Sequence, residues 1–214
     1  MDITNVIKGG VSIALKNFFS LLAASILYFL TIWIPYLNVG TTIAMISLPA
    51  ALSRGEVINP TEIFNSKYRK NMGNFFLLMA LMLMGIQIGL LFLIIPGIVL
   101  TYAWSMALLL LVDKGLNPIQ ALHESNKLTY GHKLNMFLIY LIISIGFIVI
   151  LFLIGSLGTN QECADAFYLD PLTAMFVCGA GWSKLLQAIV LMLYYPIQLG
   201  VMAMIYKSLC GTSE

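Results

Sequence analysis

Polar side chains inside long apolar runs are the residues with which this chain could act on another molecule. Gln87, Gln198, Ser105 and Ser144 are such residues, and each falls within a predicted membrane span. A polar side chain at this depth either bonds between helices, which stabilises a helix pair by roughly 0.6–2 kcal/mol, or contacts a polar ligand. For Gln87 and Gln198 both interpretations stay open: contact between helices, or contact with a lipid headgroup or another polar ligand.

The sequence offers no arrangement typical of catalysis or of metal binding. No Asp, Glu, Lys or Arg lies well inside a predicted span, although such charges are usual in ion-coupled transporters. His123 and His132 are nine residues apart, so on a continuous helix they face opposite sides. We find no nucleophile beside a base, no glycine-rich phosphate loop and no zinc-protease motif. We therefore expect neither enzyme activity nor a cofactor.

Two of the three cysteines, Cys163 and Cys178, fall in a predicted outer loop between the last two spans. A disulfide between them would close a loop of about 15 residues and stabilise the fold by roughly 3 kcal/mol. The alternative is a pair of free thiols, as expected in a reducing compartment. The third, Cys210, is expected on the cytoplasmic side.

The composition indicates an integral membrane protein. The chain has 214 residues, of which 60% are hydrophobic and only 9% are charged. Soluble domains are roughly 25% charged, and so few charges could not cover a water-exposed surface. The net charge of +2 gives no reason to expect nucleic acid as a partner.

Six apolar runs predict membrane spans, preceded by an amphipathic helix over 1–17 that lies on the membrane surface. The second run is short, roughly 21 Å against a hydrocarbon core of about 30 Å, and crosses only if its tight turn lies inside the bilayer. The runs cover 18–34, 39–52, 75–95, 98–112, 134–157 and 185–206.

Residues typical of turns and helix caps lie between these runs. Pro96 and Gly97 predict a tight outer turn between the third and fourth spans. Asn117 followed by Pro118 predicts the start of a cytoplasmic helix, because Asn caps helices and Pro suits the first helical position. Gly131 is expected to end that helix.

The same signals recur along the chain. The pairs are Ile34-Pro35 with Ile95-Pro96, Arg54-Gly55 with Lys114-Gly115, and Asn59-Pro60 with Asn117-Pro118. They predict three parallel copies of one unit within a single membrane domain, over about 1–55, 56–115 and 116–214. The predicted fold is an all-α bundle of six transmembrane helices in three repeated hairpins, with amphipathic helices on the cytoplasmic face. The alternative is that apolar helices with polar connections look alike by composition alone.

The basic residues predict the orientation. With six spans, ten of the eleven Lys and Arg residues lie on the side of both termini, and only Lys184 lies on the other. By the positive-inside rule this places both termini in the cytoplasm, in a bacterial inner membrane. The ten are Lys8, Lys16, Arg54, Lys67, Arg69, Lys70, Lys114, Lys127, Lys133 and Lys207.

The stretch from Leu93 to Lys133 carries a family resemblance. It contains LIIPGI, then YAWSMA, Asp113, NPxxALxxS from Asn117 to Ser125, and GHK from Gly131. This pattern resembles a bacterial family of uncharacterised integral membrane proteins, which is similar to the membrane domain of some glycerophosphoryl diester phosphodiesterases. The sequence contains no phosphodiesterase catalytic domain, so the resemblance implies no such activity. It also supplies no binding residues, and the long loop with Cys163 and Cys178 departs from it.

The leading functional hypothesis is a non-enzymatic polytopic membrane protein that binds lipid or a partner membrane protein, including a second copy of itself. The lack of charge in the spans and the basic amphipathic segments, which suit anionic lipid, favour it. The alternative is a transporter or channel subunit for a small molecule. Nucleic acid is not expected as a partner.

Overall fold

The structure is a computed structural model that describes residues 2–70, 72–157 and 181–210. The described residues are helical throughout their regular elements, which confirms the predicted all-helical class. The helices form two compact units. The first comprises the chain up to Leu138 together with the part from Pro196 onward, and the second comprises Ile139–Tyr195.

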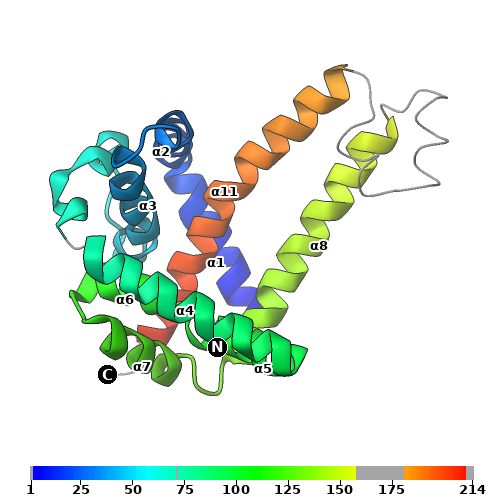
Figure 1. Cartoon of the computed structure of the whole chain (residues 1–214). Helices are drawn as coiled ribbons and strands as arrows, with labels where there is room; N and C mark the ends of the chain where they lie inside the picture. Colours follow the sequence, from blue (N-terminus) through cyan, green and yellow to red (C-terminus); the bar gives the residue numbers. More distant parts are fainter. Residues whose placement is uncertain (1, 71, 158–180, 211–214) are drawn as a thin grey trace. The chain divides into compact units, whose positions relative to one another are not determined.

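The helices follow one another with short connections in most places (Figure 1). Two short 3₁₀ helices, η1 and η2, separate α3 from α4. The bounds are α1 Ile3–Lys16, α2 Phe18–Thr31, α3 Leu37–Ser53, η1 Pro60–Phe64, η2 Ser66–Arg69, α4 Met72–Phe92, α5 Ile94–Ala103, α6 Ala107–Lys114, α7 Pro118–Leu128, α8 Lys133–Leu157 and α11 Gly181–Cys210.

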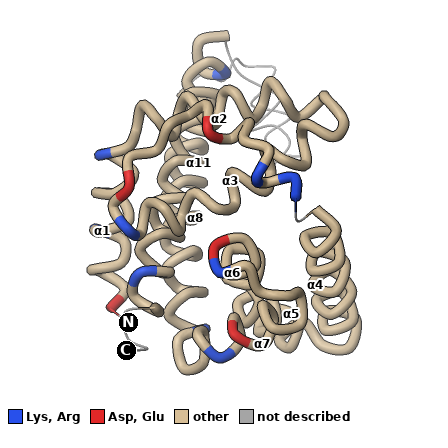
Figure 2. Tube along the Cα trace, turned by 90° about the vertical axis from the view of Figure 1, so that its left-hand side faces the viewer, with Lys and Arg blue, Asp and Glu red and all other residues tan. Residues whose placement is uncertain are grey.

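Four helical stretches in the described residues are long and apolar enough to cross a membrane: α4, the α5–α6 stretch, α8 and α11. Figure 2 shows α4 without a single charged residue along its length. Helices α1 and α2 pass the same test only together, and a bend of 77° separates them. Helix α3 is apolar but shorter. These helices fit a membrane protein, whereas six spans and the threefold repeat are not confirmed.

One contact bears on the predicted course of the chain near α3. The predicted crossing of the second run requires a tight turn inside the bilayer, toward its outer side, while Arg69 is expected in the cytoplasm. In the structure the Arg69 guanidinium lies over the Tyr36 ring, 5.9 Å from its centroid. A methyl group added at Gly40 would lie 2.9 Å from Cγ of Arg69. Groups in contact lie at the same depth, so this contact does not support a crossing of α3, and that crossing is not confirmed.

The turn between the third and fourth predicted spans is also displaced from its predicted position. The chain reverses at Leu93, which is extended with φ −160° and ψ 136°, and Pro96 and Gly97 lie inside α5. Pro96 is tolerated there because amides in the first helical turn have no intrahelical acceptor. A methyl group added at Gly89 of α4 would lie 3.1 Å from Cα of Gly97. Gly97 therefore lets α4 and α5 pack closely and does not form the turn.

The first helix packs on the C-terminal half of the last. Helix α1 has the predicted amphipathic pattern, and its buried face contains Val6, Gly10 and Ala14. A methyl group added at Gly10 would lie 2.6 Å from Cα of Val201 in α11. One added at Gly200 would lie 2.4 Å from the carbonyl oxygen of Gly10. Small residues of this kind let two helix backbones approach closely in membrane proteins.

Substituting either glycine by alanine should loosen this crossing. Gly10→Ala and Gly200→Ala each place a Cβ within van der Waals distance of backbone atoms, which we expect to destabilise the protein by about 1–3 kcal/mol. The melting temperature of purified protein in detergent measures the effect. Gly146→Ala on α8 is the matched control, because a methyl group there meets no atom within 4 Å. Equal melting temperatures for Gly10→Ala and Gly146→Ala would contradict the close crossing.

Candidate functional site

A break in one of the long helices sets the position of α6. The helix that starts at Ile94 is interrupted between Ala103 and Ala107, which leaves backbone groups without their usual helical partners. The Ser125 hydroxyl of α7 donates to the Ala103 carbonyl oxygen at 2.7 Å and accepts from the Met106 amide at 3.2 Å. The Thr129 hydroxyl donates to the same carbonyl at 3.3 Å. Both side chains are fully buried, so these bonds satisfy groups that water cannot reach.

Helix α7 is held in place by its predicted cap. The Asn117 side chain accepts from the Gln120 amide at 2.9 Å, and the Gln120 side chain accepts from the Asn117 amide at 3.4 Å. Pro118 occupies the first helical turn. Gly131 has φ +76°, a left-handed conformation that favours glycine, and it lies in the turn that follows α7. The predicted start and end residues therefore border the helix that carries Ser125.

Three helices meet at a shared carboxylate. Asp113, in the last turn of α6, accepts from Nη1 of Arg54 at 2.8 Å and from the Tyr206 hydroxyl at 2.8 Å. Arg54 lies at the end of α3 and Tyr206 near the end of α11. Nε of Arg54 also donates to Glu56 at 2.6 Å. The hydrogen bonds with Glu56 and Asp113 raise the pKa of Arg54 further above its ordinary value, so the guanidinium stays charged.

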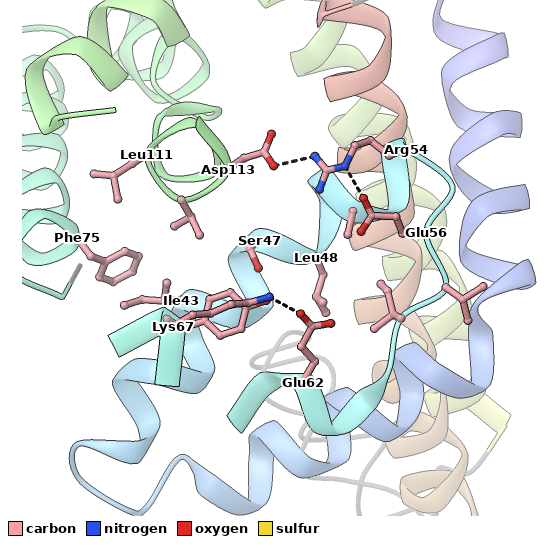
Figure 3. A pocket seen from close by; sticks show the side chains of 15 residues that line it. Ile43, Ser47, Leu48, Arg54, Glu56, Glu62, Lys67, Phe75, Leu111 and Asp113 are labelled. Atoms are coloured by element: carbon pink, nitrogen blue, oxygen red, sulfur yellow. Dashed lines mark hydrogen bonds and ion pairs between the residues drawn. The ribbon is translucent and has the colours of Figure 1, made fainter. Parts of the chain in front are cut away.

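Beside this junction lies a cavity of about 350 Å³. It is enclosed by α3, the segment from Glu56 to Tyr68, the start of α4 and the end of α6 (Figure 3). Its wall contains both apolar and charged side chains. The lining includes the apolar Ile43, Leu48, Ala51, Phe75 and Leu111 and the polar or charged Ser47, Arg54, Glu56, Glu62, Lys67, Tyr68 and Asp113.

The second cation of the cavity is Lys67, which two local caps bring into place. The Asn59 side chain accepts from the Thr61 amide at 3.2 Å, and the Asn65 side chain accepts from the Lys67 amide at 3.0 Å. The Lys67 ammonium pairs with Glu62, and this hydrogen bond raises the pKa of Lys67, which keeps the group cationic at neutral pH. Asn59-Pro60 thus starts a 3₁₀ helix.

The cavity can receive a molecule with a polar and an apolar part. Its charged side chains offer donors from Arg54 and Lys67 and acceptors from three carboxylates. Phe75 and Leu111 can cover an apolar portion of a bound molecule. Within the described residues, no group of three or more His, Cys, Asp or Glu is placed to hold a metal ion. The arrangement therefore suits binding through hydrogen bonds and apolar contact.

The polar residues singled out from the sequence do not line this cavity. Gln87 is exposed on α4, and Gln198 is half-buried in α11. The Ser105 hydroxyl donates to the Tyr102 carbonyl oxygen at 2.8 Å, and the Ser144 hydroxyl lies 3.4 Å from the Tyr194 hydroxyl. The predicted pair Cys163 and Cys178 lies outside the described residues. Sequence reasoning missed the cavity, although the recurring charge before glycine included Arg54, which lines it.

No family model, curated protein or solved structure matches this chain. Its function is therefore inferred from its own residues.

Removing the Ser125 hydroxyl tests whether its hydrogen bonds to Ala103 and Met106, here called the clamp, stabilise the helix break. Ser125→Ala leaves the Met106 amide and most of the bonding to Ala103 without a partner in a buried place, which should cost about 2–3 kcal/mol of stability. The thermal unfolding midpoint in detergent reports this loss. Ser156→Ala, an exposed serine on α8, serves as the control and should melt like the wild type. An unchanged midpoint for Ser125→Ala would show that the break needs no clamp.

Proposed function

We propose that this chain is a non-enzymatic, multi-pass protein of the bacterial cytoplasmic membrane that binds a membrane lipid in the cavity beside Asp113. The observation that carries the proposal is the mixed lining of the cavity, which combines apolar side chains with charged ones. A volume of about 350 Å³ falls in the range of small-molecule sites. The four long apolar helices support placement in a membrane.

We further propose four crossings, with both termini in the cytoplasm. The crossings are α4, the α5–α6 stretch, α8 and α11, while α2 and α3 form a hairpin that enters the membrane from the cytoplasmic side and returns. Contact between Tyr36 and Arg69 supports this hairpin. Removing α2 and α3 as a pair of crossings leaves the same ten basic residues on one side and Lys184 alone on the other. The positive-inside rule is therefore obeyed as well by four crossings as by six.

The hairpin also suits a lipid-facing position. Its second helix, α3, buries Thr41, Ala44 and Leu48, so its backbone is shielded by protein. The outer face of α2 and the following turn exposes large apolar side chains, among them Phe29, Leu30 and Trp33. Such a face stabilises a helix within one leaflet. In this arrangement the charged side chains of the cavity lie at headgroup level. Phe75 lies near the start of α4, along which an apolar acyl part can extend.

Cysteine labelling tests the topology. In a variant whose three native cysteines are replaced by serine, Lys184→Cys should react with an impermeant maleimide added to spheroplasts, because we place it outside. Trp33→Cys, at a position 87% exposed on the protein surface, should stay unlabelled from the outside, because we place it within the cytoplasmic leaflet. Lys127→Cys is the cytoplasmic control in both topologies. Labelling of Trp33→Cys from the outside would overturn the four-crossing proposal.

Native mass spectrometry tests lipid binding. Wild-type protein purified in mild detergent should retain a lipid, and Ala51→Phe should lose it because the ring occupies the cavity that Ala51 lines. Ala80→Phe makes the same change on the exposed surface of α4 and should keep the lipid. Both variants are first shown to be monodisperse with the wild-type melting temperature. Retention of lipid by Ala51→Phe, or no lipid on the wild type, would refute the proposal.

A further inference from the structure

The charges around the cavity are nearly balanced. Two cations, Arg54 and Lys67, face three carboxylates, Glu56, Glu62 and Asp113. An anionic headgroup would therefore meet a wall that carries one net negative charge, and like charges repel. A headgroup with one negative and one positive group brings no such net repulsion.

The charges form two separate clusters (Figure 3). Arg54 is bound by both Glu56 and Asp113, at 2.6 and 2.8 Å. Lys67 and Glu62 form the other pair, and Ser47 and Leu48 lie between the two clusters in this view. Each cluster thus presents a cation beside a carboxylate, as a ligand with adjacent opposite charges requires.

The Lys67–Glu62 pair can open without a second carboxylate holding the cation. Its side chains are 52% and 44% exposed, and ion pairs this accessible to water are weak. The Arg54–Glu56 pair is as exposed, but Arg54 is also held by the less exposed Asp113. A lysine ammonium is a flexible point charge, so it can turn from Glu62 to a phosphate. Glu62 is then left with an unpaired carboxylate beside that phosphate. Arg54, held by two carboxylates, keeps its place.

On these grounds, and resting on the proposed lipid-binding function, we infer that the cavity selects a zwitterionic phosphoethanolamine headgroup. Its phosphate binds Lys67, and its primary ammonium donates to Glu62. Apolar Phe75 and Leu111 cover the beginning of the acyl part.

A primary ammonium is preferred over a quaternary one. The three N–H groups of a primary ammonium can donate to a carboxylate, whereas a choline group has none. Choline is usually held by several aromatic faces, and the lining supplies Tyr68 and Phe75 alone. The Tyr68 ring already has the Lys67 ammonium 4.9 Å from its centroid.

The experiment is a titration of delipidated protein with short-chain phosphatidylethanolamine, phosphatidylglycerol and phosphatidylcholine, read by native mass spectrometry. We expect phosphatidylethanolamine to bind about tenfold more tightly than either of the others, the effect of one charge-assisted hydrogen bond. Glu62→Gln should reduce this preference to less than about threefold. Lys67→Gln should weaken the binding of both zwitterionic lipids. Lys127→Gln, outside the cavity, is the matched control and should change nothing.

The outcomes separate this inference from the proposed function. Equal binding of phosphatidylglycerol and phosphatidylethanolamine, with both lost in Ala51→Phe, would overturn the headgroup inference and leave lipid binding intact. No binding of any lipid would overturn both. The last experiment tests whether water-soluble glycerophosphoethanolamine competes with phosphatidylethanolamine for the cavity. Competition as strong as that of the lipid itself would support the headgroup inference and overturn the lipid-binding function. We expect it to compete weakly, because it lacks the part that contacts Phe75 and Leu111.

Discussion

The Ser125 hydroxyl is the interaction on which the arrangement of the first unit depends. A helix that breaks in an apolar setting exposes an acceptor and a donor that water cannot satisfy, and the cost of each is high. One buried hydroxyl bonds the carbonyl of Ala103 and the amide of Met106, so it joins the two sides of the break. The break then becomes a defined bend, and α6 continues in a fixed direction.

That direction decides where Asp113 lies. Asp113 sits in the last turn of α6, and its two oxygens bind Arg54 and Tyr206 from helices far away in the sequence. The carboxylate therefore ties α3, α6 and α11 together at one end of the unit. The cavity lies beside this junction. The positions of Arg54 and Asp113 in its lining therefore depend on the Ser125 hydroxyl of α7, which does not itself line the cavity.

The sequence predicted the local features of this structure, its helices and caps. It did not predict the contacts between residues that are far apart in the chain. Composition predicted the helices, and Asn117, Pro118 and Gly131 predicted the limits of α7, because caps are short-range signals. Pro96 was misplaced because proline suits the first helical turn as well as a reverse turn. The crossing of α3 is not confirmed, and charge counting alone could not decide it, because a crossing hairpin and a returning one leave the same basic residues on one side. Arg54 and Asp113 are 59 residues apart, so their contact left no local pattern.

The contact between Gly10 and Gly200 has a consequence for biosynthesis. Helix α1 packs on a helix nearly 200 residues further along the chain, so its glycine face has no partner until residues near 200 have been made. The first unit is interrupted in sequence by the whole of the second, and it can close only after the second has been translated. Contacts so distant in sequence form late and slowly. Helix α1 therefore remains without this partner while the residues from 17 to about 200 are synthesised.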